Sequence, residues 1–138
     1  WLFIDEVQSL FKHPAVIAYF ESFWAEGRKF GLVATGLSQN ASFMLGSDIG
    51  STMILNSDYL MLHKQSTVDR DLWAETLNLS DEEVRYIDDG IKPGDGLLVA
   101  GGARMPITSG LPKGRIYDLL TTKPSEVNAL GGGGRSAR

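Results

Sequence analysis

The chain has 138 residues, of which 43% are hydrophobic, and its formal net charge is −4. This length and composition suit one globular domain with a hydrophobic core and differ from those of disordered chains. Acidic and basic residues are mixed along the chain, so composition gives no basic footprint for nucleic acid. The absence of cysteine excludes disulfides, thiolate chemistry and cysteine-based zinc sites.

The first expected element is a strand over residues 1–4 ("WLFI"), which runs directly into Asp5 and Glu6. Its continuous apolar residues are typical of a strand buried on both faces in a parallel sheet. Such a strand needs neighbours, and the sequence starts on it without a methionine. We therefore expect this chain to be part of a longer one.

A helix and a second strand are expected next. Pro14 suits the first turn of a helix, and Gly27 suits its C-cap. The run "FGLVATG" (30–36) predicts a second parallel strand, which gives a strand–helix–strand crossover unit. The apolar residues between the two strands recur at helical spacing on one face: Val16, Ile17, Phe20, Phe23 and Trp24.

The rest of the chain predicts further short elements. Ser80 and Glu83 form a capping box, and Pro106 demotes the second strand of the hairpin around Gly101 and Gly102 to an edge. Leu72, Trp73, Thr76 and Leu77 are expected to face inward. In chain order we expect a helical stretch at 41–55, a strand in "SDYLMLHK" (57–64), helices at 67–77 and from 80, the hairpin, and a strand or helix at 116–122. The predicted domain covers 1–122, and 123–138 is a flexible glycine-rich tail.

An acidic pair that ends an apolar strand is typical of nucleotide hydrolysis. In phosphate-loop NTPases such an Asp holds the shell of a magnesium ion, and the following Glu polarises the attacking water as a general base. Asp5 and Glu6 fit these two roles. The alternative is that they are two solvated acids at the end of a strand.

Polar residues accompany the second predicted strand. Thr35 and Gln39 come just past a parallel strand, where open α/β sheets bind ligands. Gln39 could contact the γ-phosphate and its water, since an amide both donates and accepts. The alternative is a polar loop entering a helix, with Ser38 or Asn40 as the cap.

The remaining candidates are basic. Arg28 could act as an arginine finger for a neighbouring subunit, or Arg28 and Lys29 could simply complement a helix dipole. His13 and His63 stand far apart without a second ligand at metal spacing, which favours ordinary surface positions. No G-x-x-x-x-G-K-[ST] occurs in the sequence, so this chain alone should bind ATP poorly and hydrolyse it negligibly.

Several stretches together resemble one family. "FIDEVQSLF", "EGRKFGLVATGLSQN", "STMILNSDYLMLHKQ", "LNLSDEEVRYI", "PGDGLLVAGGARMPI" and "IYDLLTTKPSEV" occur in the order found in TraE-type, VirB-class conjugative-transfer ATPases of type IV secretion systems. The resemblance covers residues 1 to about 128. The chain departs from the family at Ser51 and Thr52, where a basic residue often stands, and in lacking the Walker A loop.

The resemblance implies an α/β fold, namely the C-terminal half of a RecA-like P-loop NTPase core. Parallel strands with flanking helices and a terminal β-hairpin are expected, and the phosphate loop would lie upstream of Trp1. Asp5 would hold Mg²⁺ through water, Glu6, Gln39 and Arg28 would be catalytic, and Asp5 and Thr35 would contact ATP.

For the longer protein, the resemblance implies ATP hydrolysis that energises conjugative DNA transfer. It also implies a hexamer at the cytoplasmic face of the membrane. There the protein would contact other secretion subunits directly and the transferred DNA–protein complex indirectly. Two alternatives stay open: a coupling-protein-like motor that pumps DNA itself, and a non-catalytic docking module of the secretion apparatus.

Overall fold

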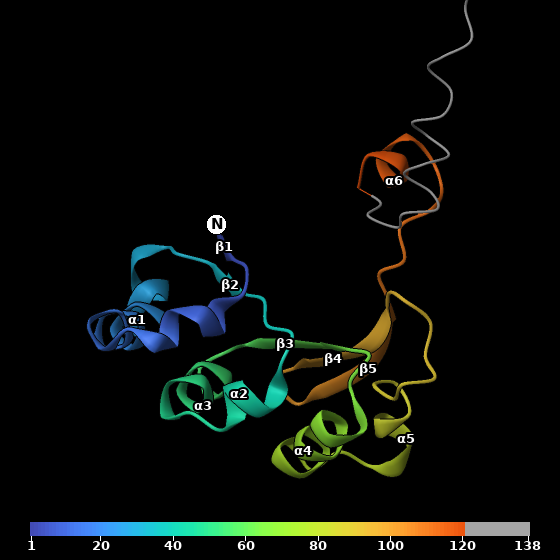
Figure 1. The fold of residues 1–138 in the computed structure, drawn as a ribbon, viewed down its shortest axis with the longest axis horizontal. Coiled ribbons are helices and arrows are strands. Elements are labelled where there is room, and N and C mark those ends of the chain that lie inside the picture. The colour runs from blue at the N-terminus through green and yellow to red at the C-terminus, as the bar shows by residue number, and fades with distance from the viewer. Residues whose placement is uncertain (121–138) are drawn as a thin grey trace, which may run out of the picture. The chain divides into compact units, whose positions relative to one another are not determined.

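The computed structural model describes residues 1–120 (Figure 1). The first compact unit covers Trp1–Thr108, and the second begins at Ser109 and contains α6. The predicted tail at 123–138 lies outside the described residues. The elements are β1 (Leu2–Ile4), a 3₁₀ helix (Val7–Lys12), α1 (Pro14–Glu26), a 3₁₀ helix (Gly27–Phe30), β2 (Ala34–Gly36), α2 (Ala41–Leu45), α3 (Asp48–Leu55), β3 (Tyr59–His63), α4 (Thr67–Leu77), α5 (Asp81–Val84), β4 (Asp95–Ala100), β5 (Ala103–Thr108) and α6 (Arg115–Leu120).

The predicted strand–helix–strand unit is confirmed. β1 and β2 pair in parallel, with Ile4 opposite Gly36, and α1 connects them (Figure 1). The prediction that β1 is buried on both faces is wrong for this chain, because Leu2 is 38% and Phe3 65% exposed. The physical reason is that β2 is the one strand beside β1 in the described part of the chain.

Helix α1 begins and ends close to the predicted residues. Pro14 occupies its first turn and Gly27 is its C-cap, as expected. Gly27 has right-handed backbone angles, and the chain continues into a 3₁₀ turn. The left-handed residue that stops this segment is Gly31, with φ 74°. Phe20 is buried on the predicted face, and Val16, Ile17 and Trp24 pack against the core.

The helical stretch predicted at 41–55 is two helices, α2 and α3. The Asn40 side chain accepts a hydrogen bond from the Phe43 amide and so caps α2, and Ser47 does the same for α3. Gly50 allows the two helices to meet at a sharp corner, because an added Cβ would lie 2.0 Å from the Met44 carbonyl oxygen. Two caps within eight residues therefore break the expected helix.

The expectation of parallel strands before the hairpin holds for β1 and β2 but is wrong for β3. This strand pairs antiparallel with β4, and β4 pairs antiparallel with β5, in a separate three-stranded sheet of order β3-β4-β5. The predicted hairpin β4–β5 is confirmed, and β5 with Pro106 is an edge strand as expected. The described fold is thus mixed α/β with one parallel and one antiparallel sheet.

The short helices α4 and α5 begin where the sequence predicts them. Helix α4 covers Thr67–Leu77, and the capping box of Ser80 and Glu83 is present at the start of α5. Thr76 is exposed and its hydroxyl donates to the Leu72 carbonyl, so its predicted inward position is wrong. The last predicted element is a helix, α6, rather than a strand.

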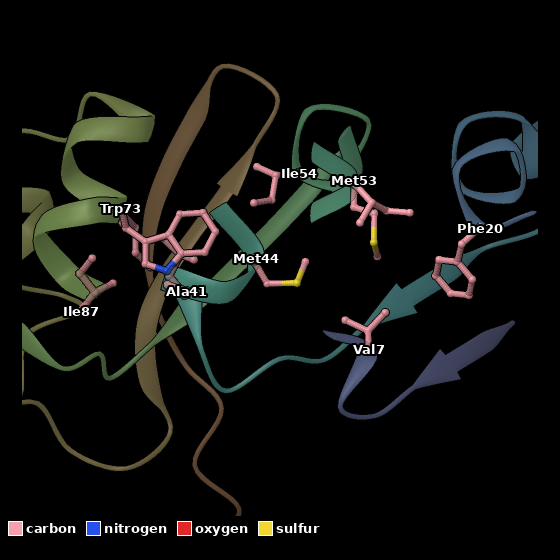
Figure 2. Packing of buried hydrophobic residues seen from close by; sticks show 11 residues of the cluster. Val7, Phe20, Ala41, Met44, Met53, Ile54, Trp73 and Ile87 are labelled. Atoms are coloured by element: carbon pink, nitrogen blue, oxygen red, sulfur yellow. The ribbon is translucent and has the colours of Figure 1, made fainter. Parts of the chain in front are cut away.

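One hydrophobic cluster lies between the elements of the first unit (Figure 2). Val7 and Phe20 contribute to it beside the parallel sheet, and Trp73 and Ile87 contribute beside the antiparallel sheet. Its members are Val7, Phe20, Ala41, Met44, Ile49, Met53, Ile54, Leu62, Trp73, Ile87 and Leu97. Helices α2 and α3 supply the central part, so both sheets share a core.

Candidate functional site

The parallel pairing brings the acidic pair beside the loop that follows β2. Ile4 and Gly36 are the last paired residues of β1 and β2. Beyond them the Leu37 amide donates to the Ile4 carbonyl at 2.8 Å, and the Val7 amide donates to the Leu37 carbonyl at 3.0 Å. Asp5 and Glu6 therefore lie in a turn that is hydrogen-bonded on both sides to the end of β2, at the edge where parallel sheets bind ligands.

Each carboxylate has one local hydrogen-bond donor. Asp5 is exposed, and its Oδ1 accepts from the Glu6 amide at 2.9 Å. Glu6 is half-buried, has left-handed backbone angles (φ 51°, ψ 43°), and accepts a hydrogen bond at Oε2 from the Gln8 side-chain amide. The second oxygen of each carboxylate has no hydrogen-bond partner among residues 1–120 and can accept from a ligand or water.

The arrangement fits a hydrated magnesium ion better than a fully protein-bound one. Within residues 1–120 no three His, Cys, Asp or Glu side chains are grouped as metal ligands. Mg²⁺ keeps several waters and is commonly bound by one or two carboxylates plus substrate phosphates. Asp5, exposed at the strand end with Oδ2 unpaired in the described chain, suits the water-mediated contact that the sequence predicts.

Thr35 and Gln39 lie at different positions relative to the acids. Thr35 is inside β2 opposite Phe3, not past the strand, and its hydroxyl accepts from the indole of Trp1 at 3.0 Å. Gln39 lies in the exposed loop three residues beyond Gly36, and its amide has no hydrogen-bond partner in the described part of the chain. The structure thus brings Gln39 to the same strand edge as the acids, whereas Thr35 lies one residue short of it.

Arg28 and the histidines are not joined to the acidic turn. Arg28 is exposed in the 3₁₀ helix after α1, and its guanidinium lies 3.4 Å from the exposed Asp58 carboxylate. Such surface pairs contribute little to stability. His13 is exposed, and the His63 ring hydrogen-bonds the Asp95 carbonyl at 3.0 Å. Arg28 therefore remains accessible to another molecule.

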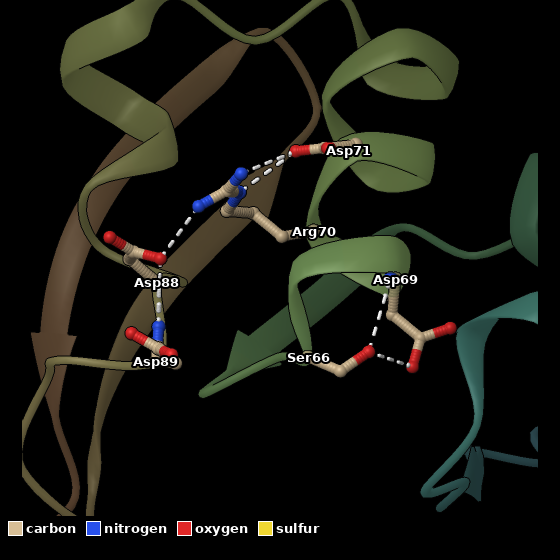
Figure 3. A network of polar contacts seen from close by, with 6 residues as sticks. All are labelled: Ser66, Asp69, Arg70, Asp71, Asp88 and Asp89. Carbon is tan, nitrogen blue, oxygen red and sulfur yellow. Dashed lines mark hydrogen bonds and ion pairs between the residues drawn. The ribbon is translucent and has the colours of Figure 1, made fainter.

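A carboxylate that the sequence analysis did not identify binds the start of α2, the helix that follows the loop containing Gln39. Asp69, in the first turn of α4, accepts from both the amide (3.0 Å) and the hydroxyl (2.6 Å) of Ser42 at the start of α2. Its other oxygen accepts from Ser66 at 2.9 Å, as Figure 3 shows. The Ser42 hydroxyl, together with Ser66 and the Ser42 amide, lowers the pKa of Asp69 below its ordinary value of 3.8. Asp69 thus fixes the helix that follows the Gln39 loop.

Two further polar groups link α4 to neighbouring segments of the chain. Arg70 pairs with Asp71 and with Asp88, at 2.7 and 2.8 Å (Figure 3). Arg104 on β5 donates to the Leu77 carbonyl at 2.6 Å and to Glu83 at 3.2 Å. Hydrogen bonds from Ser80, together with Arg104, lower the pKa of Glu83. These contacts support the fold and lie outside the acidic turn.

A shallow depression of about 300 Å³ lies elsewhere on the surface and contains no predicted site residue. Its lining comes from α1 and the turn after it: Tyr19, Ser22, Phe23, Glu26, Gly27, Phe30 and Leu32. The acidic turn, where Asp5 is exposed and Glu6 half-buried, lies outside this depression. In the described residues no helix is both long and apolar enough to cross a bilayer.

Comparison with solved structures relates this fold to a secretion ATPase. The structure of VirB4 of Thermoanaerobacter pseudethanolicus matches 91% of this chain with a TM-score of 0.68 and 25% sequence identity. The chain spans 32% of that VirB4 chain. No protein-family model and no curated protein sequence matches it. The chain is VirB4-like, and the resemblance to type IV secretion ATPases found in its sequence is confirmed.

Proposed function

We propose that this chain is the part of a type IV secretion ATPase that carries the acidic residues for ATP hydrolysis. The main support is the VirB4 likeness over 91% of the chain. A second support is the pairing of β1 with β2, because it puts the acidic turn and the Gln39 loop at one sheet edge. ATP hydrolysis then supplies the energy for the transfer of a DNA–protein complex.

In the proposed mechanism Asp5 would hold Mg²⁺ through water, and the bound ion would neutralise charge on the phosphates of ATP. Glu6 accepts the proton of a water molecule as that water attacks the γ-phosphorus of ATP. The bond from that phosphorus to the bridging oxygen breaks, which releases ADP and phosphate. Gln39 hydrogen-bonds the attacking water or the γ-phosphate. Thr35 has no role in the proposed mechanism, because it lies inside β2 and one residue short of the strand end.

The loop that holds the phosphates of ATP and a further strand of the parallel sheet come from outside these 138 residues. The sequence has no G-x-x-x-x-G-K-[ST], so another segment of the protein supplies the loop that holds the phosphates. β1 and β2 each have an unpaired edge in the described chain, to which a further parallel strand can add. Arg28 acts on the site of a neighbouring subunit in a hexameric ring. The ring docks on other secretion subunits at the cytoplasmic face of the membrane.

Turnover of the native protein that contains this sequence tests the proposal. Glu6→Gln keeps the size of the side chain and removes the base, so Mg²⁺-dependent ATP turnover should fall by about 10²- to 10⁴-fold. Nucleotide binding should be retained. The control is Glu21→Gln, which removes an exposed carboxylate on α1 and should leave turnover unchanged.

Near-normal turnover of Glu6→Gln would overturn the assignment of the base, and no hydrolysis by the native protein would overturn the proposed function. Strong stimulation of hydrolysis by DNA would instead favour a motor that pumps DNA directly. The 138-residue chain by itself should not hydrolyse ATP, since it has no phosphate loop.

A further inference from the structure

We propose that Gln8 is a positioning residue for Glu6, and that its side-chain amide fixes the carboxylate for proton abstraction. This inference rests on the proposed function. It starts from one contact: the Gln8 Nε2 donates a hydrogen bond to Glu6 Oε2. Gln8 is the only residue whose side chain bonds the Glu6 carboxylate among residues 1–120.

The backbone around Glu6 is fixed independently of this contact. Val7 is buried and its amide bonds the Leu37 carbonyl, and the Ser9 amide bonds the Glu6 carbonyl at 2.8 Å. The left-handed conformation of Glu6 turns the chain into the 3₁₀ helix that carries Gln8. The backbone therefore holds the Cα of Glu6, and Gln8 restrains the flexible end of its side chain.

The other end of the Gln8 amide indicates that the residue does little for stability. Its Oε1 is buried and has no hydrogen-bond partner in the described chain. A buried acceptor without a partner costs free energy, and this cost offsets part of what the hydrogen bond to Glu6 contributes to stability. The hydrogen bond to Glu6 is the one contact that the Gln8 side chain makes through a polar atom among these residues.

A neutral amide suits this task chemically. The N–H of Gln8 occupies Oε2 of Glu6 and leaves Oε1 to accept the proton of the attacking water. An amide adds no net charge, whereas Lys or Arg at this position would pair with the carboxylate and weaken it as a base. Misplacement of a reacting group by about 1 Å can cost about 10²-fold in rate, so the orientation of the carboxylate matters.

The test compares two glutamine-to-methionine variants in the native protein. Gln8→Met should lower kcat for Mg²⁺–ATP by about 10- to 100-fold and leave KM within about twofold. Its thermal midpoint should change little, because the variant loses the hydrogen bond to Glu6 and also removes the buried acceptor that has no partner. The control is Gln65→Met, which also removes a side-chain amide that donates at 2.9 Å, in that case to the His63 carbonyl. This control should leave kcat unchanged.

A double variant separates positioning from direct contact with the reactants. In the Glu6→Gln background, single-turnover hydrolysis should not fall further when Gln8→Met is added, because Gln8 acts through Glu6. A further fall, or a loss of kcat matched by a loss of thermal stability, would overturn the positioning role. An unchanged kcat for Gln8→Met in an active native protein would overturn it too and leave the proposed function standing. No hydrolysis by the native protein would overturn both.

Discussion

Glu6 and Asn78 are the described residues other than glycine that have positive φ, at 51° and 50°. An Asn in this position is common because its short side chain tolerates the left-handed region, whereas a Glu is unusual there. The conformation of Glu6 is imposed by its neighbours: Ile4 is paired into β1, and Val7 is buried and bonded to Leu37. The acidic side chain is thus retained at a position where glycine would fit the backbone better.

Because Glu6 has a left-handed backbone, glycine should be more stable than alanine at this position, which is the reverse of their order in a helix. Glu6→Gly should be more stable than Glu6→Ala by about 1 kcal/mol, because the left-handed conformation costs an L-residue about that much. Urea unfolding of the two variants measures the difference. At Glu21 in α1 the order should reverse, with the alanine variant more stable by about 1 kcal/mol. Equal stability of the two Glu6 variants would mean that the backbone relaxes at this turn.

The helices α2 and α4 are joined by Asp69, although Ser42 and Asp69 lie 27 positions apart in the sequence. The Ser42 amide belongs to the first turn of α2, where it has no partner within the helix. Asp69 accepts from that amide and from Ser66, the N-cap of its own helix. A single carboxylate thus binds an amide in the first turn of α2 and the hydroxyl of the residue that caps α4, and α2 directly follows the Gln39 loop.

The lowered pKa of Asp69 predicts a stability difference that depends on pH. Folding favours the ionised carboxylate, so its stabilisation is complete above the unfolded value near 3.8 and is lost as the pH falls through the lower folded pKa. Asp69→Asn keeps an acceptor but loses the charge, so it should cost about 1 kcal/mol at pH 7. The difference from the parent chain should shrink as the pH falls below 3.8.

Urea unfolding at pH 7, 4 and 3 measures this difference. The control is Glu75→Gln, an exposed carboxylate on the same helix, which should give a small difference that stays constant with pH. A difference for Asp69→Asn that is as large at pH 3 as at pH 7 would show that the charge of Asp69 does not contribute.

Elements with local signals could be predicted from the sequence. Pro14 marks the start of α1, Ser80 and Glu83 mark α5, and the glycine pair marks the turn of the β4–β5 hairpin. These signals work because a cap or a turn involves residues only a few positions apart. The order Asp5–Glu6 after an apolar run placed the acids correctly at the end of β1 for the same reason.

Strand partners could not be predicted in this way. The apolar residues of β3 do not specify whether its neighbour runs parallel or antiparallel, and the sequence does not show that β4 lies beside it. Likewise the apolar residues of β1 indicate a capacity for burial, but burial depends on which segments lie beside the strand. The contact between Gln8 and Glu6 was missed because it depends on the left-handed turn.

The acidic turn and the antiparallel sheet are connected by the shared core. Met53 on α3 lies beside the parallel sheet, since its side chain would be 3.5 Å from a Cβ added to Gly36. Leu62 and Leu97 face each other across β3 and β4 and belong to the same hydrophobic cluster. A loss of packing in one sheet should therefore lower the stability of the other, because close-packed interiors transmit such changes.

Ile87 offers the sharpest test of this connection, because it is fully buried beside the antiparallel sheet. Ile87→Ala should lower the free energy of unfolding by about 2–5 kcal/mol. Two variants of the chain, each with a single tryptophan, can report on unfolding around the two sheets by fluorescence. In one form Trp24 is kept, which packs on Phe20 in α1, and in the other Trp73 is kept, which lies in α4. In urea unfolding, Ile87→Ala should lower the midpoint by the same amount in both forms.

In each form the urea midpoint is compared with and without Ile87→Ala. The loss of stability from replacing the other tryptophans with phenylalanine therefore cancels from the difference. A midpoint that falls for Trp73 but not for Trp24 would mean that α1 and the parallel sheet unfold as a separate unit. In that case the geometry of the turn of Asp5 and Glu6 would depend only on packing around α1 and the parallel sheet. Equal shifts would mean that the geometry of the acidic turn depends on packing throughout Trp1–Thr108.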